Sequence, residues 1–131
     1  MNEIQKIEEM VLAYCEAVQT QDETAFRSLW ARESEATLIS IATVFRGIES
    51  IVRDFLLGVI QAKYASIHLI AEELQVSLRG ADTAVVLFRY HTKCIRRDDG
   101  EPYGIAGVET QLFVREAGEW KLSHVHYSKM G

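Results

Sequence analysis

The chain has little of several residue types that define specialised protein classes. Of its 131 residues, only two are cysteines, Cys15 and Cys94, and only one is a proline. A disulfide framework would show more cysteines at tighter spacing. We therefore expect two buried free thiols in a reducing compartment. No cluster of cysteines or carboxylates accompanies the histidines, as a metal site would require. We therefore expect neither a bound metal nor a cofactor.

Long hydrophobic runs and basic runs are also missing. No apolar stretch approaches the ~18 residues that span a membrane. The N-terminus is charged within its first turns and has no apolar core of a secretory signal. The net charge is −5, and the one Arg-Arg pair, residues 96–97, stands beside two aspartates. We expect a cytoplasmic protein that binds neither nucleic acid nor membrane.

What the chain does contain is typical of one globular domain. Hydrophobic residues make up 48 % and charged residues 25 % of the sequence, a balance that excludes a disordered chain. The length fits one domain over residues 1–131 and leaves little room for a second.

Helical periodicity marks two long segments and one short segment between them. The first has apolar residues at Ile4, Ile7, Val11, Tyr14, Cys15 and Val18, and the other long one at Ile48, Ile51, Val52, Phe55, Leu56, Val59 and Ile60. The short helix runs through Phe26, Leu29 and Trp30. Either a capping box of Thr20 and Glu23 or Asp22 alone starts it.

The rest of the chain is strand-like. We predict a short strand at 36–41, a turn at 45–47, and long strands at 66–79, 83–97, 103–115 and 120–128. Within 66–79 the apolar residues change from odd-numbered to even-numbered positions, which predicts a β-bulge near residues 71–73. The fold class is α+β, with the order ααβα followed by four strands. Strands this long twist, so the antiparallel sheet should curl around the third helix and leave a cavity.

Several short motifs, in this order and spacing, resemble a known superfamily. They are AYCEA at residues 13–17, QDE at 21–23, FRG at 45–47 and GEWKL at 118–122. The chain resembles the cystatin-like, cone-shaped roll of nuclear transport factor 2 (NTF2). Within that superfamily it is similar to SnoaL-like and ketosteroid-isomerase-like proteins. The resemblance implies a pocket protein, and an isomerase- or cyclase-like activity if it is an enzyme.

A closer likeness is to the association domain of calcium/calmodulin-dependent kinase II. The segment His124-Val125-His126-Tyr127-Ser128 matches that family's His-x-His-x-Ser strand, and Glu109-Thr110 matches its Glu-Thr pair. Arg89 corresponds to an arginine that lines the cavity in that family. Two further cavity arginines are replaced here by Gln111 and Tyr127. The likeness implies a free-standing relative of an oligomeric module.

Tyr14 and Glu109 are the first candidates for a functional role. Tyr14 lies on the apolar stripe of its helix, and a buried phenol needs a hydrogen-bond partner. In ketosteroid isomerases a tyrosine at the matching place polarises a carbonyl, helped by a protonated carboxylic acid, and Glu109, or Thr110 beside it, falls near the position of that acid. The alternative is a core tyrosine and a salt-bridged Glu109. No carboxylate stands at residues 38–41, where the isomerase base would be, so steroid isomerisation is not expected.

Arg89 and the histidines complete the candidates. Arg89 lies mid-strand between Phe88 and Tyr90, so it either binds a ligand carboxylate or pairs with Glu109 on the adjacent strand. His124 and His126 share a strand face with Trp120 and Leu122, unless a bulge exchanges the faces. The full set of predicted ligand-binding residues is Tyr14, Trp30, Phe55, Arg89, Glu109, Gln111, His126 and Tyr127.

Two hypotheses follow. In the first, the chain is a stand-alone pocket protein that binds a small apolar molecule carrying a carbonyl or a carboxylate. In the second, it is an association module with a vestigial pocket. Val85 and Leu87 alternate with Ala84, Val86 and Phe88, so the sheet is apolar on both faces. Because the helices cover only one face, we expect a homodimer at least, formed through the other.

Overall fold

The structure is a computed structural model that describes residues 1–130. The helices are α1 (Glu3–Thr20), α2 (Glu23–Ser28) and α3 (Ile48–Ser50), which continues directly as the π-helix η1 (Ile51–Gln61). The strands are β1 (Thr37–Ile39), β2 (Val44–Arg46), β3 (Tyr64–Leu78), β4 (Thr83–Arg96), β5 (Pro102–Tyr103), β6 (Ala106–Glu116) and β7 (Glu119–Met130).

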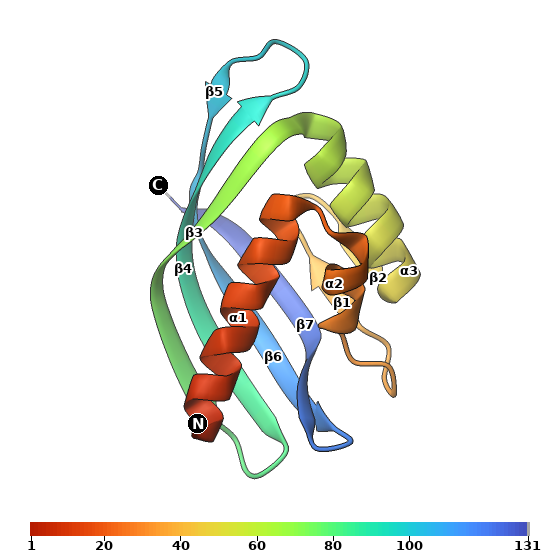
Figure 1. The fold of residues 1–131 in the computed structure, drawn as a ribbon, viewed down its shortest axis with the longest axis vertical. Coiled ribbons are helices and arrows are strands. Elements are labelled where there is room, and N and C mark those ends of the chain that lie inside the picture. Colours follow the sequence, from red (N-terminus) through yellow and green to blue (C-terminus); the bar gives the residue numbers. More distant parts are fainter. Residues whose placement is uncertain (131) are drawn as a thin grey trace.

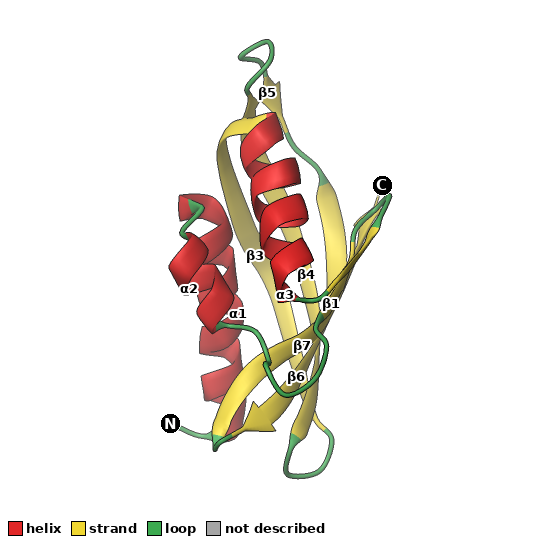
Figure 2. Ribbon diagram, turned by 90° about the vertical axis from the view of Figure 1, so that its right-hand side faces the viewer, coloured by secondary structure: helices red, strands yellow, loops and turns green. Residues whose placement is uncertain are grey.

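All the strands join one sheet in the order β2-β1-β7-β6-β4-β3, with β5 paired to one end of β4. Neighbouring strands are antiparallel except β1 and β7, which are parallel. The sheet is strongly curled, and the helices lie together on its concave face (Figures 1 and 2). This is the predicted α+β roll. No helix among residues 1–130 is both long enough and apolar enough to cross a membrane.

Local sequence signals account for the first two helices. Asn2 caps α1 by accepting a hydrogen bond from the Gln5 N–H at 2.8 Å, and the Gln5 side chain accepts from the Asn2 N–H. Asp22 caps α2 by accepting from the Ala25 N–H at 3.0 Å. Of the two starts weighed for the second helix, the structure therefore has Asp22 as the N-cap.

The segment around Phe45 differs from the prediction. Residues 44–46 form a strand rather than a turn, because β2 pairs with β1 as a short hairpin. The chain turns one residue later at Gly47, whose φ of +82° favours glycine. The predicted strand over 103–115 is also divided, since Gly104 and Ile105 interrupt it between β5 and β6.

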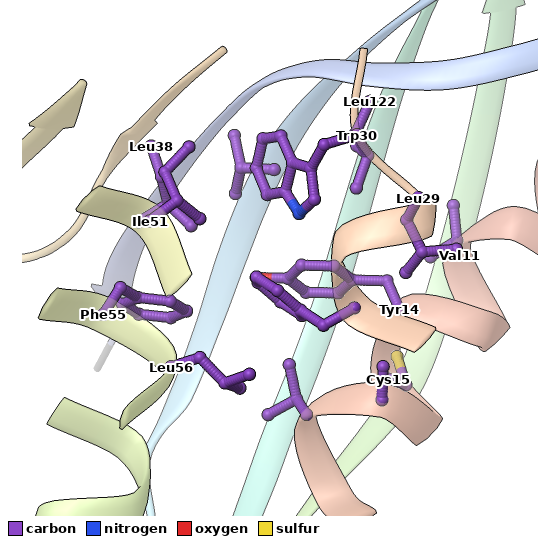
Figure 3. Packing of buried hydrophobic residues seen from close by; sticks show 14 of the residues in the cluster. Val11, Tyr14, Cys15, Leu29, Trp30, Leu38, Ile51, Phe55, Leu56 and Leu122 are labelled. Carbon is purple, nitrogen blue, oxygen red and sulfur yellow. The ribbon is translucent and has the colours of Figure 1, made fainter. Parts of the chain in front are cut away.

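The second long helix is wider than its periodicity suggests. It begins as α3 and continues as η1, in which backbone bonds reach one residue further than in an α-helix. At its end the Ala62 N–H donates to the Leu57 carbonyl, five residues back. Its apolar face, including Ile51, Phe55 and Leu56, still packs into the core opposite Tyr14 and Trp30 (Figure 3).

Bulges in β3 and β7 decide which side chains face the interior. The predicted bulge in β3 is confirmed, because the register with β4 shifts between Ala71 and Glu73, and a further shift lies at the start of the strand, between Tyr64 and Ser66. Another bulge lies in β7, where the register with β6 shifts at Ser123, between Leu122 and His124. This bulge exchanges the faces of β7. Leu122 is buried, but the alternation then resumes with Val125 inside and His126 outside.

Side-chain contacts tie the ends of distant elements together. Arg97, just after β4, donates through Nε to the Gln61 carbonyl at 2.9 Å and through Nη2 to the Tyr64 carbonyl at 2.9 Å. It thereby joins the last turn of η1 to the start of β3. At the other end of the molecule, Glu3 of α1 accepts from Trp120 Nε1 at 2.6 Å and from Arg115 at 2.5 Å.

Candidate functional site

A cavity of about 330 Å³ lies between η1 and the concave face of the sheet. Its closed end is formed by side chains that are almost fully buried, among them Tyr14 (2 % exposed) and Glu109 (3 %). Its open end is lined by the exposed loop 40–43, Lys63 and Tyr103. Most of the wall between the two ends is apolar, with Phe45, Phe55, Val59, Ile60, Ile67, Leu69 and Ile105 contributing to it.

Four different elements bring the polar groups of the closed end together. Tyr14 comes from α1, Tyr90 from β4, Glu109 from β6 and Tyr127 from β7, and all four line the cavity. Glu109 pairs directly with Tyr127 in the β6–β7 register. The sheet therefore presents a carboxyl and two phenols to the phenol of Tyr14 on the helix.

The carboxyl group of Glu109 is buried in a mostly apolar part of the cavity. Burial raises its pKa to about 7, and the hydrogen bond from Gln111 opposes that rise. Gln111 Nε2 donates to Glu109 Oε1 at 3.3 Å. Among residues 1–130, no cation forms an ion pair with Glu109, so the alternative of a salt-bridged Glu109 is wrong. Near neutral pH this group is therefore poised between an acid that donates and a carboxylate that accepts.

The phenols of the closed end stay protonated. Burial, with the nearby charge of Glu109, raises the pKa of Tyr14 well above its ordinary value. The same two causes raise the pKa of Tyr127 to about 12. The Tyr14 hydroxyl donates to no group within residues 1–130, although its side chain is buried. The Tyr14 phenol is therefore a hydrogen-bond donor at the closed end that no group within residues 1–130 engages.

The predicted ligand-binding residues divide into two groups. Tyr14, Phe55, Glu109 and Tyr127 line the cavity. Gln111 lies behind Glu109, fully buried, and its Oε1 has no partner in the described part of the chain.

Trp30 does not line the cavity but packs in the adjacent core at 5.9 Å from the ring of Phe26. Its indole Nε1 is likewise buried without a partner within residues 1–130. Figure 3 shows this nitrogen directed toward Tyr14. The interior around the closed end thus holds a second unpaired donor.

Arg89 and His126 lie on the other face of the sheet. Arg89 pairs with Val108 in register, and its side chain is 50 % exposed, with Nη2 3.6 Å from Glu72. The expectation of an arginine facing the cavity is therefore not met, and neither is the alternative of an Arg89–Glu109 pair. His126 is exposed beside His124, because the bulge at Ser123 turns both outward.

His124 accepts or donates a hydrogen bond with the Thr37 hydroxyl at 2.6 Å. Burial, with the neighbouring His126, lowers the pKa of His124. Within residues 1–130 no group of three or more histidine, cysteine or acidic side chains is arranged to hold a metal ion.

Sequence reasoning missed several residues of the cavity wall. Tyr90, Thr92 and Cys94 line it, in the same strand and with the same parity as the buried Phe88. The signal was present in part, because β4 alternates and these residues share the parity of Ala84, Val86 and Phe88, but the sequence did not say which of the two apolar faces is inside. The exposed residues of the open end, such as Lys63 and Thr43, gave no such signal since they lie outside regular strands.

The comparisons with known proteins agree with this architecture. No curated protein matches the chain. Among solved structures, an NTF2-like superfamily protein from Salmonella enterica is 25 % identical with a TM-score of 0.91, covering 97 % of this chain and 90 % of its own. A protein with a cystatin-like fold from Caulobacter vibrioides is 15 % identical with a TM-score of 0.83, covering 98 % and 89 %.

A third structure is the hexachlorocyclohexane dehydrochlorinase LinA-type3 from Novosphingobium barchaimii, 17 % identical with a TM-score of 0.86, covering 97 % and 86 %. At such identities the last two likenesses show the fold alone. The likeness to the kinase association domain is not confirmed. The model of the SnoaL-like domain matches residues 1–126. The chain therefore belongs to the SnoaL-like domain family.

Proposed function

We propose that the chain binds a small, mostly apolar molecule and receives a carbonyl oxygen of that molecule at the closed end of the cavity. The observation that carries the proposal is the hydroxyl of Tyr14, which belongs to a side chain that lines the cavity, has no hydrogen-bond partner within residues 1–130 and shares the closed end with Glu109. A hydrogen bond from this hydroxyl to a ligand oxygen would add about 0.5–1.5 kcal/mol to the affinity.

The charge of the closed end favours a carbonyl over a carboxylate there. Arg89, the cation expected to hold a carboxylate, lies on the opposite face of the sheet. Glu109, with its pKa of about 7, would repel a second carboxylate whenever it is ionised. A neutral carbonyl instead accepts hydrogen bonds from Tyr14 and from the protonated form of Glu109.

The residues that line the cavity also decide which group could transfer a proton to a bound ligand. β1 carries no carboxylate, and Ser40 is the polar residue that follows it at the cavity wall. Among the residues that line the cavity, Glu109 is the one carboxyl group. If the bound carbonyl compound is converted, the proton transfer falls to Glu109, whose pKa lies close to neutral pH.

Calorimetry with 4-butylacetophenone, an apolar ketone, tests the proposal. We expect saturable binding by the unmodified chain and a rise in its melting temperature. Tyr14→Phe should weaken binding about tenfold, the equivalent of one good hydrogen bond. Tyr103→Phe, which removes a phenol at the open end instead, is the matched control and should bind as the unmodified chain does. Equal affinities for the unmodified chain and Tyr14→Phe would contradict the proposal.

A second candidate function is self-association through the outer face of the sheet. Val85, Leu87, Val108 and Leu112 lie on that face, and Leu87 is 40 % exposed. Val85 and Leu112 are paired in register, and Leu87 follows Val85 on the same face of β4, while Leu87 is paired with Thr110 and Val108 with Arg89. A second copy of the chain would bury them, and this role is compatible with ligand binding.

A further inference from the structure

The open end of the cavity carries positive charge, in a chain whose net charge is −5. Lys63 lines the cavity and also a shallow depression just outside it, which it shares with Arg96, Asp98 and Tyr103. We propose that this mouth binds a carboxylate at the far end of the same ligand. The inference rests on the proposed function and adds the class of ligand, an apolar molecule with a carbonyl at one end and a carboxylate at the other.

Lys63 is available to such a group. It follows the last turn of η1 and precedes β3, where its side chain is exposed. Within residues 1–130 its ammonium makes no ion pair and no hydrogen bond. A lysine on a flexible stem reaches back over a neighbouring opening at little cost, because its charged end stays in water.

Arg96 is held in place by aromatic rings. Its guanidinium lies 4.7 Å from the centre of the Tyr103 ring, and Tyr103 stacks on Tyr64 with ring centres 6.2 Å apart at 15°. Both tyrosines line the cavity. Such stacking fixes the plane of the guanidinium while leaving its N–H edge free to donate.

The charge balance of the depression fits one negative charge. Among its lining residues Lys63 and Arg96 are positively charged and Asp98 is negatively charged, which leaves one positive charge. Asp99 lies 3.6 Å from Arg96, a loose pair at the surface. Arg97 is committed to the carbonyls of η1 and β3. A monoanion is therefore favoured over a phosphate dianion, which the two aspartates would repel.

The length of the cavity fixes the spacing of the two ligand groups. Tyr90, Thr92 and Cys94 line it in turn along β4, from the closed end to the point where Cys94 pairs with Tyr103. Four residues of extended strand cover about 13 Å. A ligand whose carbonyl oxygen lies at Tyr14 and Glu109 would thus place a carboxylate about that distance away, within reach of Lys63.

Two matched ketones test the inference: 4-(4-acetylphenyl)butanoate and its methyl ester. They share the carbonyl and the apolar body and differ at the far end, where a methyl group caps the carboxylate of the ester and removes its charge. Calorimetry on the unmodified chain should give a Kd for the carboxylate about three- to tenfold lower than for the ester. The preference should shrink as sodium chloride is raised, because both cations are exposed to solvent.

Lys63→Gln should remove most of the preference for the carboxylate and leave the Kd of the ester unchanged. Adding Arg96→Gln to this variant should lower the preference further. Arg79→Gln removes one positive charge from the turn at the opposite end of the sheet and should keep the full preference. Equal affinity of the unmodified chain for both ketones would overturn the mouth site alone and leave carbonyl binding intact. Failure of both ketones to bind would overturn the proposed function and this inference with it.

Discussion

Tyr90 and Gly107 pair across strands β4 and β6, and the phenol of Tyr90 occupies the space where a side chain of residue 107 would stand. A Cβ added to Gly107 would lie 2.6 Å from the Tyr90 hydroxyl oxygen and 2.6 Å from the Ser128 carbonyl oxygen. The absence of a side chain at this one position lets a phenol reach the closed end of the cavity beside Glu109.

Gly107→Ala should therefore disturb both the sheet and the site. The added methyl group meets backbone as well as a ring, so we expect a loss of about 1–3 kcal/mol in the free energy of unfolding, measured by urea denaturation. Adding Tyr90→Phe should recover only part of this loss, since the contact with Ser128 remains. Full recovery in the double variant, or no loss in Gly107→Ala, would contradict this account of the pair.

The stability of the fold should depend on pH through Glu109. Its pKa of about 7 in the folded chain lies above the ordinary 4.5, so the folded state holds this proton more tightly than the unfolded state. The free energy of unfolding should fall as pH rises from about 4.5 to about 7, by about 3 kcal/mol in total. Glu109→Gln should flatten this part of the profile and be more stable than the unmodified chain at pH 8. An unchanged slope in the variant would assign the effect to other groups.

Ketone binding should share this pH dependence. The protonated form of Glu109 donates to a carbonyl oxygen, and the ionised form does not. The affinity for 4-butylacetophenone should be constant at low pH and fall as pH rises through about 7. Isothermal calorimetry from pH 5.5 to 8.5 measures it, and Glu109→Gln, whose amide still donates, should bind independently of pH. A flat profile for the unmodified chain would remove Glu109 from contact with the ligand.

Self-association should be visible in solution. Light scattering of the unmodified chain at micromolar concentration should give at least a dimer, because a second copy would bury the exposed Leu87 and the partly exposed Val85 and Leu112 beside it. Leu87→Lys places a charge in the middle of that face and should shift the equilibrium to the monomer. Ile41→Lys, a substitution of another exposed apolar residue (57 %) at the cavity mouth, is the control and should not. A monomeric unmodified chain would end this proposal.

Much of the fold follows from periodicity in the sequence. The spacing of Ile7, Val11 and Tyr14 places α1 and its buried stripe, and the parity switch near Ala71 places the β3 bulge. For Glu109 the resemblance offered a protonated acid and the alternative was a salt-bridged side chain; in the structure it is buried and its pKa is raised. The helical spacing and the parity switch are local signals, because each depends on residues within a few positions of one another.

Of the two misplaced residues, His126 depends on a contact distant in sequence. The bulge at Ser123 arises from pairing between β6 and β7, and no pattern inside β7 announces it. It turns His126 outward although the two-residue period set it with the buried Trp120 and Leu122. Arg89 was expected to face the cavity on the basis of a resemblance. Its neighbours Phe88 and Tyr90 point inward, so strand alternation alone places Arg89 on the outer face.

Arg97 has a consequence for how a ligand enters and leaves. One guanidinium bonds the end of η1 to the start of β3, and the backbone N–H of the same residue donates to the Lys63 carbonyl at 2.8 Å. These bonds join η1, Lys63 and the start of β3 on this side of the rim. The opposite rim, loop 40–43, is held mainly by the Ser40 hydroxyl bonded within its own turn. We therefore expect movement of loop 40–43 to set the rate at which a ligand enters and leaves the cavity, while the side held by Arg97 stays fixed.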